Sequence, residues 1–167
     1  SSSRQPFVVG YESMITAAGF AKITEEKQDN LNLFLARKLE NITKFIVIDD
    51  AYGYNSIAVA PYAVLTNSYV LFANANNIVT VSSFLNGRKV SNILIYGHVD
   101  KAVIDALNKY APEFLNKDGD RFANNVEIVK KYRTINPKKQ VVLTNGEFIE
   151  QEIMTGVEPV LFIGKES

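Results

Sequence analysis

FIVIDD at residues 45–50, NSIAVAPYA at 55–63 and YVLF at 69–72 are the stretches that decide the fold. FIVI is a short apolar run rich in β-branched residues, which is typical of a strand buried on both faces. NSIAVAPYA predicts a helix, with a kink or a break at Pro61 because proline cannot donate the helical hydrogen bond. YVLF predicts a second strand. A strand, a helix and a strand in succession predict parallel pairing through a right-handed crossover.

The same kinds of element continue on both sides of this unit. Upstream, apolar residues recur at helical spacing and predict a helix over residues 24–40, with Thr24 as its N-cap. Downstream, residues 93–96 predict a strand, and residues 100–110 predict an amphipathic helix that ends before Pro112. Two shorter segments are candidate strands, residues 78–81 and an edge strand at 7–9.

A second, shorter series resembles the first. NNVEIVKKY at 124–132 is similar to LNLFLARKL at 31–39, QVVLTNG at 140–146 to FIVIDD, and PVLF at 159–162 to YVLF. A spacing of about 90 residues is too long for a solenoid unit and fits a repeated α/β module. The predicted elements of this series are a helix at 120–132, a strand at 141–144, a helix at 148–154 and a strand at 160–163.

The pattern predicts an α/β fold with a mainly parallel, doubly wound sheet of Rossmann or flavodoxin type, helices on both faces and an internal repeat. We expect a linker and possible edge strand at residues 1–22, a first repeat at 23–116 and a partial second repeat at 117–167, docked on the first. The turn KDGD at 117–120 marks the boundary. The residues expected to be buried in one sheet are Ile46, Ile48, Val70, Phe72, Ile93, Ile95, Val142, Val160 and Phe162.

Composition narrows the possible functions. Among 167 residues, Lys and Arg total 18 and Asp and Glu total 18, so no net charge favours nucleic acid. The chain has no cysteine, which excludes disulfides, thiolate nucleophiles and thiolate metal ligands. No apolar run reaches the ~20 residues of a membrane span. The opening SSSRQP is expected to be a polar linker rather than a signal peptide.

Three places could carry chemistry, and each has a simpler interpretation. Asp49 and Asp50 follow a predicted strand, where open α/β sheets place ligands or metals, but no later predicted strand ends directly in an aspartate, so turn or capping roles are favoured. His98 follows Gly97 and is favoured as a turn residue over a general base. LTNGE at 143–147 could bind an anion at a helix N-terminus, although an ordinary turn is favoured. No nucleotide-binding glycine motif is present, and we predict no catalytic residue, metal ligand or cofactor.

Four segments resemble the cell-wall-binding repeat type 2 family. GDRFANNVEIVKKY at 119–132 is similar to its Gly-x-x-Arg-Tyr-x-Thr opening and first helix, and NSIAVAPYA to its Asp-Ala-Leu-Ser-Ala-x-Pro-Leu-Ala helix, with Pro61 and Ala63 in register. YVLFANANN at 69–77 and ILIYGHVDKAVIDAL at 93–107 are similar to its following strands, turns and last helix. Asn55 replaces the family's helix aspartate, Gly97-His98 replaces a glycine pair, and the first copy lacks the arginine-aromatic opening.

The resemblance implies a non-enzymatic cell-surface module that anchors a protein to a glycan or anionic polymer of the cell envelope or cell wall. It implies an extracellular location, S-layer-type architecture, and further repeats of the chain or a homo-oligomer as partners, without nucleic acid or a membrane span. Tyrosines and asparagines near the predicted turns suit sugars, since rings stack on sugar rings and amides bind hydroxyls, although such tyrosines also serve in ordinary packing. The predicted polymer-binding residues are Tyr52, Tyr54, Asn55, Asn74, Asn76 and Arg121.

Two alternatives stay open. One is a cytosolic flavodoxin-like domain that binds a small ligand or metal at the carboxyl ends of its strands. The other is a structural domain that contacts only its neighbours within a larger envelope protein.

Overall fold

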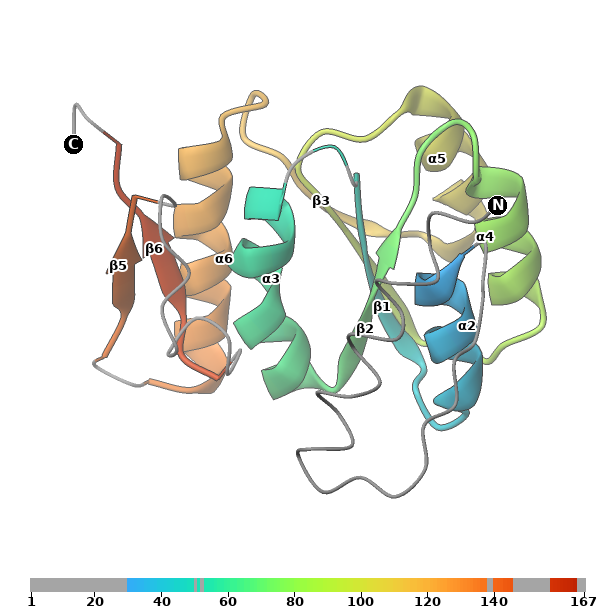
Figure 1. Cartoon of the computed structure of the whole chain (residues 1–167), viewed down its shortest axis with the longest axis horizontal. Coiled ribbons are helices and arrows are strands. Elements are labelled where there is room, and N and C mark those ends of the chain that lie inside the picture. The colour runs from blue at the N-terminus through green and yellow to red at the C-terminus, as the bar shows by residue number, and fades with distance from the viewer. Residues whose placement is uncertain (1–29, 50, 52, 138–139, 146–156, 165–167) are drawn as a thin grey trace, which may run out of the picture. The chain divides into compact units, whose positions relative to one another are not determined.

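The computed structural model describes residues 30–164 apart from residues 50, 52, 138–139 and 146–156. From Asn32 onward the described residues belong to one compact unit. The elements, coloured in chain order in Figure 1, are α2 (Leu31–Lys38), β1 (Lys44–Ile48), α3 (Gly53–Thr66), β2 (Ser68–Phe72), α4 (Ile78–Asn86), β3 (Asn92–Tyr96), α5 (Lys101–Leu107), the 3-10 turn η1 (Asn108–Tyr110), β4 (Glu113–Leu115), α6 (Arg121–Ile135), β5 (Val142–Thr144) and β6 (Val160–Phe162).

The main sheet has four parallel strands in the order β2-β1-β3-β4. In this register Phe45 of β1 lies between Tyr69 of β2 and Ile93 of β3. The chain leaves β1 toward β2 on one side and then returns across β1 to β3 on the other. The carboxyl ends of β1 and β3 therefore form the topological switch point of the sheet, where such folds bind ligands.

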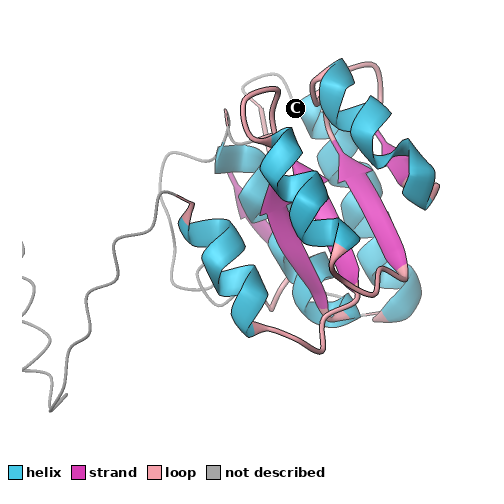
Figure 2. Cartoon of the chain, turned by 90° about the vertical axis from the view of Figure 1, so that its right-hand side faces the viewer, coloured by secondary structure: helices cyan, strands magenta, loops and turns pink. Residues whose placement is uncertain are grey.

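Both faces of the sheet are covered, because successive β1 side chains point to opposite sides. Phe45 and Val47 lie in a core with buried residues of α2, α4 and α5. Ile46 and Ile48 lie in a second core with buried residues of α3 and α6. Figure 2 shows the helices on both sides of the strands. The predicted parallel, doubly wound α/β fold is thus confirmed, with β1 buried on both faces.

The second pair of strands forms a separate sheet, which corrects the prediction that all the listed core residues share one sheet. β5 and β6 pair in parallel with each other. In Figure 1, α6 and α3 lie between this pair and the four-stranded sheet. Val160 and Phe162 nevertheless belong to the same core as Ile46 and Ile48, because they pack against the helices that also cover β1. Three of the listed residues, Val70, Phe72 and Val142, are half-buried.

A side-chain contact ties α2 to the outer edge of β2. The Asn32 amide nitrogen donates to the carbonyl oxygen of Val70 at 2.9 Å. The Asn32 amide oxygen accepts from the backbone N–H of Phe72 at 3.3 Å. One amide therefore pairs with the strand as a neighbouring strand would.

The same contact recurs in the second series. The Asn125 amide donates to Val160 O and accepts from Phe162 N–H, both at 2.8 Å. Asn125 aligns with Asn32 in the predicted repeat, so this pair supports the duplication, which stays a hypothesis. Ile46 pairs with Val70 in the first series, and Val142 pairs with Val160 in the second. Val142 therefore corresponds to Ile46, whereas the sequence alignment matches Ile46 with Val141.

Two predicted elements need correction, one strand was not predicted, and three predicted features lie outside the described residues. Residues 78–81 begin the helix α4, whose buried Ile78, Val81 and Leu85 recur at helical rather than strand spacing. α3 is one continuous helix through Pro61, without the predicted break. β4, with exposed Glu113 and Phe114, was not predicted. The candidate strand at 7–9, the cap at Thr24 and the helix at 148–154 fall outside the described residues. Among described residues, no helix is long and apolar enough to cross a membrane.

Candidate ligand site at the carboxyl ends of the sheet

A cavity of about 480 Å³ opens at the switch point. Ligand sites in proteins commonly enclose ~300–1,000 Å³. The cavity collects side chains and backbone from the ends of β1 and β3 and from the starts of α3 and α6. Its lining residues are Asp49, Ala51, Tyr54, Asn55, Gly97, His98, Gly119, Arg121 and Asn124.

Gly97 forms the turn at the end of β3, next to the Asn55 amide. Gly97 has a φ of +74°, which L side chains rarely adopt, and a Cβ there would lie 3.4 Å from the Asn55 amide nitrogen. Its own N–H donates to Leu115 O at 2.9 Å, so the turn is tied to β4. Asn55 is half-buried and lines the cavity.

The turn before α6 is held by its own asparagines. Gly119 has a φ of +75°, and its N–H donates to the Asn116 amide oxygen at 3.0 Å. The buried Asn124 amide oxygen accepts from the backbone N–H of Lys117 at 2.6 Å. These contacts fix the predicted KDGD boundary turn against the helix that follows it.

Asp120 is the N-cap of α6. Its carboxylate accepts hydrogen bonds from the N–H groups of Phe122 and Ala123 at 2.8 and 3.2 Å. Arg121 is therefore the first residue of a well-capped helix, and its side chain extends from that end into the cavity lining.

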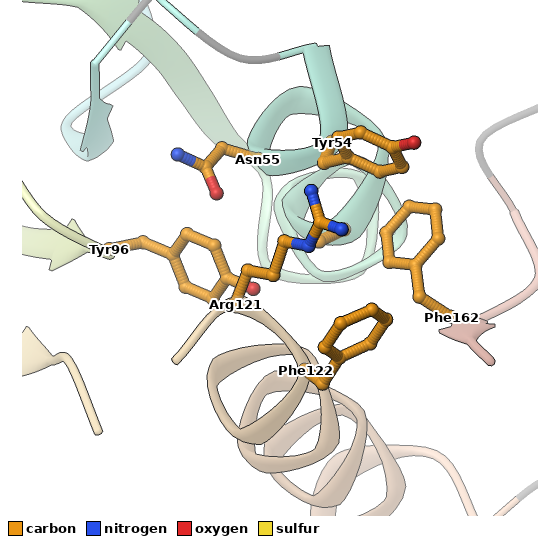
Figure 3. Close-up of a pocket in the computed structure, with 7 residues that line it drawn as sticks. Tyr54, Asn55, Tyr96, Arg121, Phe122 and Phe162 are labelled. Atoms are coloured by element: carbon orange, nitrogen blue, oxygen red, sulfur yellow. The ribbon is translucent and has the colours of Figure 1, made fainter. Parts of the chain in front are cut away.

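The Arg121 guanidinium rests on aromatic rings. Its central carbon lies 4.8 Å from the ring centroid of Tyr54 and 4.9 Å from that of Phe122. Tyr54 in turn meets Phe162 edge-to-face with ring centroids 5.1 Å apart. Figure 3 shows the guanidinium between Tyr54 and Phe122. Among the described residues no carboxylate pairs with Arg121, so its donors are held in place but not neutralised.

A second cavity, of about 10 Å³, adjoins the first through three shared residues, Tyr54, Asn55 and Arg121. Tyr96, at the end of β3, lines it with only 1% of its surface exposed. Burial raises the pKa of Tyr96 well above its ordinary value, so the hydroxyl keeps its proton. In Figure 3 its oxygen points toward the Arg121 side chain.

The structure brings together half of the predicted polymer-binding residues. Tyr54, Asn55 and Arg121 line both cavities, although they come from different helices. Asn74 lies in the turn after β2, where its amide oxygen accepts from the backbone N–H of Asn76 at 2.9 Å. Neither of these two asparagines lines either cavity. Tyr52 falls outside the described residues.

Sequence reasoning did not select several of the lining residues. Asp49 and His98 were interpreted as turn residues, and Asp49 does accept the N–H of Ala51 at 2.6 Å, as a turn aspartate does. Both residues follow strands of a predicted parallel sheet, and residues at that position often line ligand sites. Their position was therefore the feature of the sequence that could have identified them. Tyr96 and Asn124 carried no such signal, because a buried tyrosine in a strand and an asparagine in a helix are ordinary. Asp50 is outside the described residues, within which no group of three possible metal ligands occurs.

No protein-family model and no curated protein matches the chain. Among solved structures the chain is similar to Cwp6 from Clostridium difficile, with a TM-score of 0.72 and 17% sequence identity. The match covers 92% of this chain and 27% of Cwp6, so the chain spans about a quarter of that protein's length. At this identity the likeness shows a shared fold.

Proposed function

We propose that the chain is a cell-surface module that binds a polymer of the cell envelope at the switch-point cavity without catalysing a reaction. The observation that carries this proposal is the convergence of Tyr54, Asn55 and Arg121 around one cavity at the carboxyl ends of β1 and β3. All three are among the polymer-binding residues that the sequence predicts.

The three side chains offer complementary contacts to a glycan. An aromatic ring such as that of Tyr54 stacks on the apolar face of a sugar. The Asn55 amide can donate to and accept from hydroxyls. Arg121 adds a fixed positive charge, suited to the carboxylates or phosphates of anionic polymers. The cavity opens to the protein surface at His98 and Gly119, which are both exposed. A long polymer needs such an opening, because only part of it can lie in the cavity.

The structural comparison supports a cell-surface role at a coarse level. Cwp6 from Clostridium difficile is a cell wall protein, and most of this chain shares its fold. The resemblance to the cell-wall-binding repeat type 2 family in four segments points in the same direction. Anchoring to a wall polymer is proposed from the residues of the cavity.

The cavity groups also support a binding role rather than catalysis. The Asp49 carboxylate is engaged by the N–H of Ala51, and His98 is exposed. Within the described residues no hydrogen bond joins the two as a base and its orienting acid.

The position of the cavity at the switch point also favours a second candidate function, the binding of a soluble small ligand in the same cavity.

Co-sedimentation tests the proposal. The full chain is mixed with cell walls from the organism that encodes it, and with the same walls after extraction of their anionic and glycan polymers. We expect binding to native walls, loss of binding to extracted walls, and weaker binding by Tyr54→Leu. Arg133→Gln, an exposed position at the far end of α6, serves as the control and should bind normally. Equal sedimentation with native and extracted walls, or none with either, would contradict polymer binding.

A further inference from the structure

We infer that the small cavity beside Tyr96 is a subsite for one anionic oxygen of the ligand, with the Tyr96 hydroxyl as its specificity-determining donor. The inference rests on the proposed function, because it assigns a chemical class to the polymer bound at the same site. The shared chemistry is an oxygen of a carboxylate, as in an acidic sugar, or of a phosphate, as in a polyol phosphate chain.

The Tyr96 side chain borders the small cavity, and only 1% of the residue's surface is exposed. No hydrogen bond joins its hydroxyl to another described residue. A hydroxyl at the edge of a cavity is placed to hydrogen-bond to whatever polar group fills that cavity. A bound ligand oxygen would supply the acceptor.

Two other residues with donor groups line the same small cavity as Tyr96. They are Arg121 and Asn55, and no hydrogen bond joins either side chain to another described residue. Arg121 is held by the rings of Tyr54 and Phe122, so its direction is set before any ligand arrives. A guanidinium, an amide and a hydroxyl together form a donor-rich pocket, which favours an anion over a neutral group.

The sizes of the two cavities suit two different parts of a ligand. About 10 Å³ is near the smallest space that holds a water molecule, so the inner cavity admits a single oxygen-sized group. The outer cavity, of about 480 Å³, has room for the sugar or polyol that carries it. Asp49, the carboxylate of the outer cavity, is not among the inner lining residues.

NMR titration of the full chain at low ionic strength provides the test, with D-glucuronate, glycerol 3-phosphate and neutral D-glucose as probes. We expect at least one anionic probe to bind about tenfold more tightly than glucose, since a hydrogen bond to a charged group is roughly twice as strong as a neutral one. Tighter binding of D-glucuronate would indicate that the ligand oxygen belongs to a carboxylate, and tighter binding of glycerol 3-phosphate would indicate a phosphate.

Paired variants locate the effect. Tyr96→Phe keeps the ring and removes the hydroxyl, and it should weaken the anionic probe about fivefold to tenfold while leaving glucose unchanged. Arg121→Gln should weaken the same probe at least as much. Tyr110→Phe, whose hydroxyl contacts Asn86 elsewhere, and Arg133→Gln are the matched controls and should bind as the wild type does.

The outcomes separate this inference from the proposed function. If the chain binds native walls but Tyr96→Phe leaves every probe and wall binding unchanged, the anionic subsite is overturned and the proposed function stands. If the anionic probe binds and both variants lose it while walls are not bound, the subsite holds and envelope anchoring is overturned. Equal affinity for glucose and both anions would also overturn the subsite.

Discussion

Gly97, which lines the cavity, has a left-handed backbone conformation. A substitution to alanine forces an L side chain into the left-handed region and places its Cβ 3.4 Å from the Asn55 amide. We expect Gly97→Ala to lower the free energy of unfolding by about 1–2 kcal/mol, measured by urea denaturation. Gly87→Ala is the control, since its φ of −84° is ordinary and a Cβ there would find only Phe84 O at 3.6 Å. A Gly97→Ala protein as stable as Gly87→Ala would contradict the strained turn.

The Asn125 side chain holds α6 against β6 through two hydrogen bonds to the backbone. Asn125→Ala would leave the Val160 carbonyl and the Phe162 N–H buried without partners, each at a cost of about 1–3 kcal/mol. We expect a loss of about 2–5 kcal/mol in chemical denaturation, and a smaller loss for Asn32→Ala, which is half-buried with one longer bond. Exposed Asn76→Ala should stay within about 0.5 kcal/mol of the wild type. Similar losses at Asn125 and Asn76 would refute this role.

Among elements, α6 depends on its cap. Removing the Asp120 carboxylate frees the N–H groups of Phe122 and Ala123, so Asp120→Ala should cost about 0.5–2 kcal/mol. Asp120→Asn keeps a side-chain acceptor and should cost little. Thermal unfolding followed by circular dichroism would rank the three proteins. An alanine variant equal to the asparagine variant would show that the cap is not needed.

Elements that the sequence predicted well have strong local patterns. β1 is a continuous apolar run buried on both faces, and α6 lies in a segment whose sequence is similar to the predicted helix at residues 31–39. The start of α4 was misinterpreted because Ile78 to Val81 is rich in β-branched residues, and the buried positions that reveal a helix come later, at Phe84 and Leu85. β4 was missed because Glu113–Leu115 is short and mostly exposed, and it forms a strand through pairing with β3.

At the scale of the molecule, the β5–β6 pair and the main sheet share one core. Phe162 packs with Tyr54 and belongs to the cluster that includes Ile46 and Ile48. Truncating it should therefore destabilise both sheets together, by about 3–5 kcal/mol for Phe162→Ala. We expect one unfolding transition, with hydrogen exchange accelerated in β1 as well as in β6. A separate early transition confined to β5 and β6 would contradict the common core.

The site was only partly predictable, because it is assembled from segments far apart in the chain. Tyr54 and Asn55 were selected from local composition, and Arg121 belonged to the segment that resembled a family opening. That these residues meet at one cavity depends on the packing of α6 against α3, which no local pattern reports. Asn74 was selected for the same chemistry as Asn55, but its amide is used in the turn after β2.

Chemical-shift mapping by NMR would locate the polymer-binding site on the protein. Isotope-labelled chain is titrated with solubilised envelope polymer, and the backbone amide signals are followed. We expect the largest shifts at the cavity lining, at Asn55, Gly97, His98 and Gly119, and we expect these shifts to be smaller in Arg121→Gln. Shifts centred elsewhere, or unchanged in that variant, would contradict a polymer site at the switch point.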